Sequence, residues 1–315
     1  MRATRLLLGV AALLWVPWLI ATTVDIDARS WRIPAAVAFL PYVVVLTAVV
    51  LVVAALLRSR AAAIGALIGL VVLGIPRLGR LTHDDQPAAR GPIVTIATGN
   101  VLVGHADPTF LARLVRGEHV DLLAIQENTP EWDAAARRAG LLRTLTHGAT
   151  DPDPRPGAAG LALWSRWPIT RLPAAPGDHR SLGGLVNVPG AATPVHVRSV
   201  HPPPPFNARN VPCWKRCTRA FRHAADATGD ALLVGDFNAT LDHHPIRSLL
   251  GDDGFRDAAE EAGAAWRPTW SNGSWATLTI DHVLATRRIA IEGVTVHDLP
   301  GSDHDVVVAR VRLPR

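Results

Sequence analysis

Cysteine is scarce in this chain, which contains only two in 315 residues. Cys213 and Cys217 flank Trp-Lys-Arg, and residues four apart share one face of a helix. This spacing fits either a strained disulfide, which an oxidising exterior would permit, or two buried free thiols. Two cysteines alone make a poor metal site, so metal ligands must be sought among other residue types.

Net charge is also lacking over most of the chain. Before Gly91 there are nine arginines against four aspartates, whereas from Gly91 onward 23 basic residues stand against 23 acidic ones. The whole net charge of +5 therefore belongs to the N-terminal part. Proteins that bind duplex nucleic acid usually carry a basic surface, because contacts to phosphates dominate their affinity. The charge balance therefore disfavours nucleic acid as a partner.

What the N-terminal part does contain is three uncharged apolar runs, Leu6–Val24, Ile33–Leu57 and Ala61–Ile75. A membrane-spanning helix needs roughly 20 apolar residues, so the first two runs qualify and the third needs help from its flank. A secretory signal peptide is the alternative for the first run, but no small-residue cleavage site is obvious. We predict about three transmembrane helices in a membrane anchor of residues 1–81.

The arginines near these runs bear on orientation. Arg2 and Arg5, with Arg58 and Arg60 in the tight second loop, favour an N-terminus inside the cytoplasm, whereas the arginines of the first loop and those after the third run oppose it. Three spans would then place the C-terminal domain outside the cytoplasmic membrane, and a failed third span would place it inside. We expect a multi-pass protein of the cell membrane with an extracytoplasmic domain.

Residues 82–91 are predicted to be a short polar linker, and residues 92–315 to be one α/β domain. The segment Gly148–Gly157, rich in Pro, Asp and Gly, is typical of a surface loop. The strands expected from apolar runs are Ile93–Thr98, Val120–Gln126, Leu161–Ser165, Val195–Val200, Ala231–Val234, Thr277–Leu284 and Val306–Val311. The helices expected are Pro108–Arg116, which Asp107 would cap, Glu131–Ala139, Ala208–Thr228, Pro245–Leu250 and Phe255–Glu261.

Polar residues follow several of these strands. In Gly235-Asp236-Phe237-Asn238 a carboxylate and an amide stand two residues apart, so both can point into one site. Such a carboxylate can take a proton from water that the amide orients. Each motif alone has a structural reading, since Asp236 and Asn238 are ordinary turn formers and Glu127 could cap a helix. Their recurrence at strand ends favours a ligand site.

The order of these motifs carries a resemblance. Asn100, Gln126-Glu127, Gly160-x-Ala-Leu-x-Ser-Arg166, His201, the Gly-Asp-Phe-Asn motif, Ile280-Asp-His282 and Ser302-Asp-His304 are similar to the endonuclease/exonuclease/phosphatase superfamily. That superfamily includes DNase I, abasic-site endonucleases, neutral sphingomyelinases and inositol-polyphosphate phosphatases. The likeness runs from about Ile93 to the C-terminus. It implies a DNase I-like, four-layer α/β sandwich, in which two mostly antiparallel sheets pack face to face with helices outside.

The resemblance implies a metal site. Glu127 matches the main Mg²⁺ ligand of the superfamily, Asn100 would lie beside it, and Asp303 would complete the region. The residue types fit independently, because Mg²⁺ prefers oxygen ligands and keeps several waters, so that one or two carboxylates and a substrate phosphate suffice. Mn²⁺ is the alternative ion.

The resemblance also implies catalytic roles. Asp236 would activate or orient the attacking water, and Asn238 would hold that water or the phosphate. His304 would contact the phosphate oxygens, with Asp281 orienting its imidazole, and His201 would be the general acid for the leaving group. A histidine held by a carboxylate has its orientation fixed and its protonated form stabilised.

Two places depart from the superfamily pattern. Thr98-Gly99 stands where an aromatic residue often precedes the Asn, and Pro202–Pro205 replaces the usual continuation after His201. The chemistry survives both departures, but the pocket beside His201 is harder to infer. Trp270, in Arg267-Pro-Thr-Trp270, would be either core packing or a wall of the substrate site.

These observations predict a membrane-anchored, Mg²⁺-dependent phosphohydrolase that acts on a phosphorylated lipid-linked or cell-envelope substrate. The arrangement resembles actinobacterial VanJ-type teicoplanin-resistance membrane proteins, which suggests a polyprenyl pyrophosphate or a related lipid. A membrane-tethered nuclease and a sphingomyelinase-like phosphodiesterase are alternatives with the same chemistry. A catalytically inactive binding module is the alternative of another class, and the intact acids and histidines argue against it.

Overall fold

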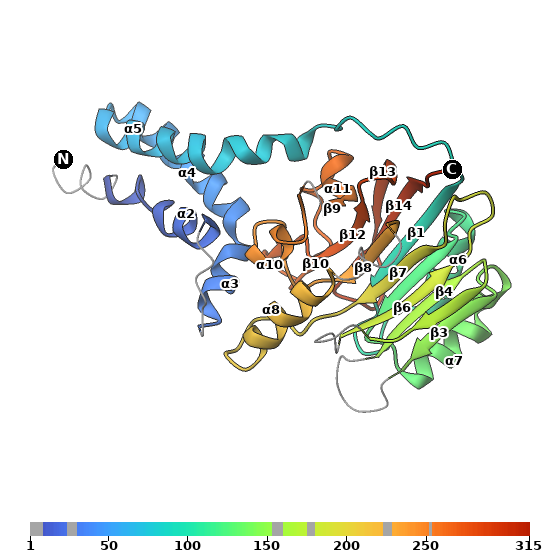
Figure 1. Ribbon diagram of the computed structural model, residues 1–315. Helices are drawn as coiled ribbons and strands as arrows, with labels where there is room; N and C mark the ends of the chain where they lie inside the picture. The colour runs from blue at the N-terminus through green and yellow to red at the C-terminus, as the bar shows by residue number, and fades with distance from the viewer. Residues whose placement is uncertain (1–8, 24–29, 153–159, 175–179, 223–228, 252–253) are drawn as a thin grey trace.

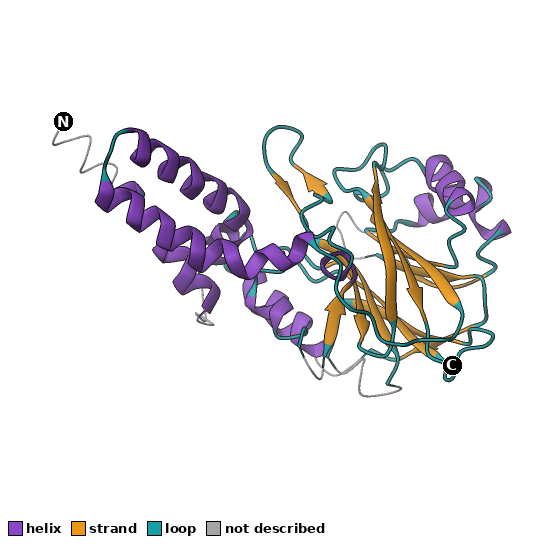
Figure 2. Cartoon of the chain, turned by 90° about the horizontal axis from the view of Figure 1, so that it is seen from above, coloured by secondary structure: helices purple, strands orange, loops and turns teal. Residues whose placement is uncertain are grey.

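An arm of N-terminal helices projects from one end of a sandwich of strands (Figure 1). The computed structural model describes residues 9–23, 30–152, 160–174, 180–222, 229–251 and 254–315. We call residues 9–81 the arm and residues 92–315 the sandwich. Figure 2 shows the two parts from above, with the helices of the arm on one side and the strands on the other.

The sandwich contains two six-stranded sheets and a separate two-stranded hairpin. The first sheet has the order β13 (Ala290–His297), β14 (Val306–Arg312), β1 (Ile93–Asn100), β2 (Leu122–Gln126), β4 (Leu161–Ser165) and β3 (His147–Asp151). The second has the order β5 (Ile169–Leu172), β6 (Ser181–Val186), β7 (Val195–Val200), β8 (Ala231–Asp236), β12 (Asp281–Thr286) and β9 (Phe255–Asp257). The hairpin joins β10 (Trp270–Ser271) to β11 (Thr277–Leu278).

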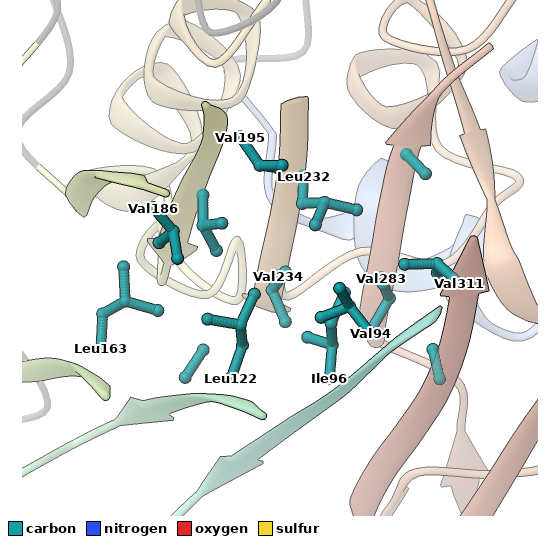
Figure 3. Close-up of a cluster of buried hydrophobic side chains, with 14 of the residues drawn as sticks. Val94, Ile96, Leu122, Leu163, Val186, Val195, Leu232, Val234, Val283 and Val311 are labelled. Atoms are coloured by element: carbon teal, nitrogen blue, oxygen red, sulfur yellow. The ribbon is translucent and has the colours of Figure 1, made fainter. Parts of the chain in front are cut away.

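The apolar strands are buried on both faces. Successive side chains of a strand point to opposite faces, so a run without polar residues fills two layers. Ile96 of β1 and Val234 of β8 meet between the sheets, as Figure 3 shows, whereas Leu233 faces the opposite way. The sandwich therefore has a central core and an outer core on each side.

Helices cover the two outer cores. α6 (Pro108–Gly117) and α7 (Pro130–Arg138) lie over the first sheet, and α8 (Asn210–Ala220) with the short α10 (His244–Arg247) lies over the second. The four layers confirm the predicted α/β sandwich. As expected, Asp107 caps α6 by accepting a hydrogen bond from the amide of Thr109. Cys213 and Cys217 of α8 are not joined by a disulfide, and their sulfur atoms lie 3.3 Å apart.

Some predicted elements are wrong. Residues 148–151 of the expected surface loop belong to the edge strand β3, while residues 153–157 lie outside the described part of the chain. The expected helix Phe255–Glu261 begins as β9, which pairs with β12, and only Ala258–Glu261 is helical (α11). The expected strand Thr277–Leu284 is divided into β11 and β12. Edge strands of three to five residues are too short for their periodicity to identify them.

The arm does not follow the predicted lengths of its three apolar runs. It comprises α2 (Val16–Thr23), α3 (Arg32–Ala38), α4 (Leu40–Leu56) and α5 (Arg60–Gly69), and α5 continues through a π-helical turn (Leu70–Gly74, η1) and a 3-10 helix (Ile75–Leu81, η2). Among the described residues, Arg60–Leu81 is long and apolar enough to cross a bilayer. The pair α3 and α4, bent by 61°, would count as a second span only if taken as one.

The second run is therefore bent rather than straight, and the third is the longest continuous helix. Pro41 explains the bend, because proline lacks an amide donor and its ring clashes with the carbonyl four residues earlier, so the helix breaks at Phe39 and restarts at Leu40. The first run forms an apolar helix over Gly9–Thr23, shorter than a span, and its ends at residues 6–8 and 24 lie outside the described part. Three transmembrane helices stay a prediction.

Ion pairs and hydrogen bonds attach the arm to the sandwich. Arg77 and Arg80 both pair with the carboxylate of Asp242, at 2.8 and 3.1 Å. The ring of His243 lies 2.8 Å from the carbonyl oxygen of Pro34 in α3. The hydroxyl of Tyr42 accepts a hydrogen bond from the amide of Thr277 at 2.9 Å. The arm is thus packed against the sandwich at several points.

The linker also packs against the sandwich. The amide of Asp84 donates to the carbonyl of Glu261 at 3.1 Å, and the side chain of Gln86 accepts from the amide of Ile291 at 2.7 Å. Gly91 donates to the carbonyl of Leu313 at 2.8 Å. Residues 82–91, the predicted linker, therefore run along the sandwich rather than as a free tether.

Candidate functional site

Strand pairing brings the polar strand ends to one edge of the sandwich. β1 and β2 run parallel, so Asn100 pairs with Gln126, the residue before Glu127. β12 runs antiparallel to β8, which places Asp281 opposite Asp236. His201 follows Val200 of β7, a strand parallel to β8 that pairs with it at Gly235. The register of the sheets therefore gathers the polar residues at the strand ends into one place.

Asp236 lies at the centre of this edge and is almost fully buried. Its Oδ2 accepts a hydrogen bond from Nδ2 of Asn100 at 3.1 Å and lies 3.5 Å from Nε2 of His201 and 3.7 Å from Nε2 of His304. Its Oδ1 accepts from the amide of Asn238 at 2.7 Å. Burial raises the pKa of Asp236, His304 opposes that shift, and the nearby Asp281 adds to it. This is the environment of a carboxylate that can accept a proton.

His304 is held by Asp281, as expected. The Nδ1 of His304 lies 2.9 Å from Oδ2 of Asp281, and the same oxygen accepts a hydrogen bond from the Thr269 hydroxyl at 2.7 Å. Burial opposes protonation of His304, but the carboxylates of Asp281 and Asp236 prevail and raise its pKa to about 10. At neutral pH the imidazole is a cation, suited to contact phosphate oxygens.

His201 has a different environment, although it lies in the same cluster. Its Nε2 is 3.8 Å from Oε1 of Glu127, and burial lowers its pKa. Its Nδ1 is buried with no hydrogen-bond partner in the described part of the chain. His201 is therefore neutral before substrate arrives, and a bound phosphate would be the charge that favours its protonation.

The predicted metal residues offer the donors that Mg²⁺ prefers. Glu127 accepts from Asn100 at 3.1 Å and from the amide of Val103 at 2.8 Å, so its carboxylate is oriented from both sides. Asp303 accepts from the indole of Trp270 at 2.9 Å through Oδ2, whereas its Oδ1 is buried without a partner. A buried carboxylate oxygen without a partner is costly unless a cation or donor meets it. Glu127 and Asp303 thus fit a hard divalent cation.

Asp236, Asp281 and His304 form a second group whose ligand atoms lie within 4.8 Å of one another. Nδ1 of His304 is already bonded to Asp281, and imidazole is a poor ligand for Mg²⁺. The group is better suited to holding and moving a proton than to holding this ion. Glu127 and Asp303 are therefore the better candidates for metal ligands, with Asn100 orienting Glu127.

Two residues of the site have strained backbones. Glu127 has φ of 59° and Asn238 has φ of 49°, a left-handed conformation that residues other than glycine seldom adopt. Val103, whose amide holds Glu127, is left-handed too, with φ of 51°. Such strain persists only where the surrounding structure enforces it, and it gathers at functional sites.

A cavity of about 420 Å³ opens over the cluster. Asn100 and Asp281 do not line it, because they lie behind Glu127 and His304 and orient them. Trp270 lines the cavity and donates a hydrogen bond to Asp303. Of the two roles expected for it, the structure therefore supports a wall of the site rather than core packing. The predicted residues that reach the cavity are Glu127, His201, Asp236, Asn238, Asp303 and His304.

Sequence reasoning missed several contributors. Thr269 holds Asp281, and only its position beside Trp270 could have drawn attention to it. The amide of Val103 holds Glu127, and backbone donors leave no signature in residue type. Phe39, from the second apolar run, lines the cavity although it was expected in a membrane helix.

Two mixed sheets packed face to face, with acids, an amide and histidines gathered at one edge, define a phosphoester hydrolase of the DNase I-like class. The chain belongs to the endonuclease/exonuclease/phosphatase family, which residues 97–304 match. Members of that family are generally dependent on a divalent metal.

Solved structures share this fold. An endonuclease/exonuclease/phosphatase of Beutenbergia cavernae is 23% identical, with a TM-score of 0.55 over 71% of this chain and 72% of that one. The APE2 catalytic domain of Xenopus laevis is 15% identical, with a TM-score of 0.55 over 70% and 94%. A humanized D. rerio TDP2 is 14% identical, with a TM-score of 0.55 over 70% and 98%. No curated protein matches the chain.

Proposed function

We propose that this protein is a membrane-anchored, Mg²⁺-dependent phosphohydrolase that cleaves a phosphoester or pyrophosphate bond in a lipid-linked or cell-envelope substrate. The observation that carries the proposal is the Asp236 carboxylate, which two histidines approach on one oxygen inside the cavity that Glu127 and Asp303 also line. A base, a cation and a metal site lie in one enclosure, as hydrolysis of a phosphate requires.

The residues take complementary parts in this proposal. Asp236 orients the attacking water and takes its proton, while Asn238, bonded to Asp236 and to the carbonyl of Pro202, holds that water or the phosphate. The cationic His304 faces the phosphate oxygens, and His201 gives a proton to the leaving group. A divalent ion held by Glu127 and Asp303 would neutralise charge on the phosphate.

The membrane and lipid parts of the proposal rest on other observations. The balanced charge from Gly91 onward offers no overall attraction for a polyanion, and the arm carries the apolar helices. The resemblance to VanJ-type membrane proteins, which we infer from the arrangement of the sequence alone, suggests a polyprenyl pyrophosphate or a similar lipid. We also propose that the sandwich is extracytoplasmic. A reporter fused to the C-terminus tests this, and cytoplasmic exposure would exclude an envelope substrate without affecting the chemistry.

Phosphate release by the full-length protein in detergent tests the chemistry. The panel contains pyrophosphate lipids, phosphomonoesters and plasmid DNA, each with EDTA and then with added Mg²⁺ or Mn²⁺. We expect metal-dependent release from a lipid pyrophosphate or lipid phosphate, and we expect Glu127→Gln to need more metal for half-maximal activity. If every substrate is left intact with either metal, the domain is an inactive binding module.

The same panel distinguishes the alternatives that share this chemistry. Nicking of plasmid DNA by the wild type but not by an Asp236→Asn variant would identify a membrane-tethered nuclease. Release of a phosphorylated headgroup with the diacyl or ceramide part left behind would identify a sphingomyelinase-like phosphodiesterase. Either result would leave the roles of the site residues standing and replace the substrate.

A further inference from the structure

The cavity over the catalytic cluster has two chemically different sides. Its polar side is the cluster itself, from Glu127 to His304. Its other side is apolar and comes from three places in the chain: α3 and the residue after it, the segment after His201, and the strand ends near β11 and β12. The apolar residues on this side include Ala35, Ala38, Phe39, Pro204, Pro205 and Phe206.

The arm supplies α3 to this wall through fixed contacts. The carbonyl of Pro34 meets His243, and the ring of Phe39 packs against Trp275 with centroids 5.8 Å apart. Tyr42, at the start of α4, accepts from the Thr277 amide and packs edge-on against the same tryptophan. Because these contacts hold α3 against the sandwich, the wall is part of the folded site.

Charge limits what this wall can bind. No lysine or arginine is among the described residues that line the cavity. A nucleic-acid strand or a highly charged inositol phosphate would need cations beyond the reacting phosphate. One phosphate or pyrophosphate group on an apolar body matches both sides of the cavity, with the phosphate on the cluster and the body along α3.

Exposed aromatic residues stand around the opening. Phe206, which lines the cavity, is 62% exposed, and Trp275, which packs against the lining residue Phe39, is 69% exposed. Tryptophan at the level of lipid headgroups is common in membrane proteins, because its ring is apolar and its N–H polar. The opening therefore lies on the side of the sandwich that carries the arm.

We propose that α3, Phe39 and the segment Pro204–Phe206 form a binding wall for the hydrocarbon tail of a phosphorylated lipid. The arm is then part of the substrate site as well as the proposed anchor. This inference rests on the proposed function for the identity of the reacting group, but it concerns the recognition of the tail. It assigns chain-length selectivity to residues that take no part in hydrolysis.

Binding of ethylphosphonate and decylphosphonate to the full-length protein tests the inference, because a phosphonate binds without being cleaved. All proteins are measured by calorimetry in the same detergent, so that partition of the decyl compound into micelles affects every variant equally. Burial of methylene groups favours the longer tail, and we expect wild type to bind decylphosphonate at least about tenfold more tightly than ethylphosphonate.

Two variants alter the wall in opposite senses. Phe206→Ala removes an exposed ring that the tail would contact. Ala35→Phe adds a ring to half-buried Ala35 of α3, where it would occupy the space that the tail needs. Both variants should therefore reduce the decyl-to-ethyl preference by at least about threefold. Trp31→Ala removes another exposed ring, 40% exposed, that does not line the cavity, and it should keep the wild-type preference.

Equal affinity of wild type for the two phosphonates, or an unchanged preference in both wall variants, would overturn the inference. Hydrolysis of the matching ethyl and decyl phosphates and pyrophosphates, measured in parallel with Mg²⁺, tests the proposed function separately. A protein that binds the decyl compound through this wall but cleaves neither substrate would support the tail site and contradict the enzyme.

Discussion

Asp236 shows how one carboxylate can be surrounded by groups of different charge. It lies between a cationic His304 and a neutral His201. The two rings differ because Asp281 lies 2.9 Å from His304, whereas at His201 burial outweighs the nearby carboxylates. Separating the protonation states of two neighbouring histidines gives a site both a fixed cation and a group able to exchange a proton.

The Asp236→Asn variant removes the charge and keeps the shape. We expect kcat to fall by about 10²–10⁴-fold, because the proton acceptor is lost, with no loss of thermal stability, because burial penalises the charged form. Steady-state kinetics and a thermal melt measure both. Asp107→Asn is the control, because it makes the same change at the N-cap of α6, where asparagine also caps a helix. A decrease of less than tenfold would contradict the role of Asp236.

The Asp281→Asn variant addresses the charge of His304. Losing this carboxylate lowers the pKa of His304 from about 10, so the imidazolium is lost at a lower pH as pH rises. We expect the alkaline limb of kcat against pH to move to lower pH, with little change near pH 6. Asp151→Asn, an exposed carboxylate, is the control. An unmoved limb would mean that Asp281 does not act through His304.

Most of the site could be predicted from residue types, because acids, an amide and histidines follow strands in a recognisable order. Thr269 could not, since a threonine before a tryptophan has many readings and its partner Asp281 is 12 positions away. The left-handed backbones of Glu127 and Asn238 could not be predicted either, because strain depends on neighbours that the local sequence does not show.

At the scale of elements, long buried strands were predictable and edges were not. β4 and β7 have the predicted ends, since continuous apolar runs bounded by polar residues mark them. β5, β6 and β13 were missed, because glycines and exposed positions interrupt their apolar pattern. Position in the sheet, rather than propensity alone, decides which weak segments become strands.

Gly235 is the element-scale feature that most restricts the site. Its φ is +151°, and a Cβ there would lie 2.2 Å from the carbonyl oxygen of Val200 and 3.0 Å from Nε2 of Gln126. We expect Gly235→Ala to destabilise the protein by about 1–3 kcal/mol, because β7 and β8 must separate.

Denaturant unfolding in detergent measures this effect. Gly117→Ala is the matched control: that glycine is exposed at the end of α6 and has no atom within 4 Å of an added Cβ, so the change should be neutral or stabilising by about 0.4–1 kcal/mol. Equal stability of the two variants would mean that β7 and β8 are less tightly paired than described.

At the scale of the whole molecule, the arm and the sandwich meet through residues that no local pattern connects. Arg77 and Asp242 are 165 positions apart. The arginines after the third run, which opposed the predicted orientation by their position near a span, are paired with an acid of the sandwich. Their contribution to topology is therefore not that of free cations beside lipid headgroups.

Asp242→Asn tests this junction. Burial alone would raise the pKa of Asp242, but Arg80 and Arg77 prevail and lower it below 3.8. A carboxylate whose pKa is lowered on folding stabilises the fold at all pH above 3.8. This stabilisation is lost as the pH falls through the pKa that the carboxylate has in the folded state. We expect the variant to lose about 3 kcal/mol at neutral pH, because the buried Arg77 is left without its carboxylate and Arg80 keeps only its pair with Glu260.

Thermal melts and limited proteolysis within residues 82–91 measure the loss. Asp133→Asn removes the partner of Arg137 within α7, a pair with an exposed arginine that contributes at most about 0.5 kcal/mol, and serves as control. Wild-type stability and wild-type protease resistance in Asp242→Asn would show that the ion pairs do not hold the arm.

The shared carboxylate of Asp242 also has a consequence for how these residues change together in evolution. Arg77 and Arg80 in the arm share one acid in the sandwich, and Arg80 pairs with Glu260 as well. Relatives that lack Asp242 are therefore expected to have replaced Arg77, whereas Arg80 can remain where Glu260 does. A chimera that joins this arm to another sandwich should fold only where the recipient offers a carboxylate at the same place.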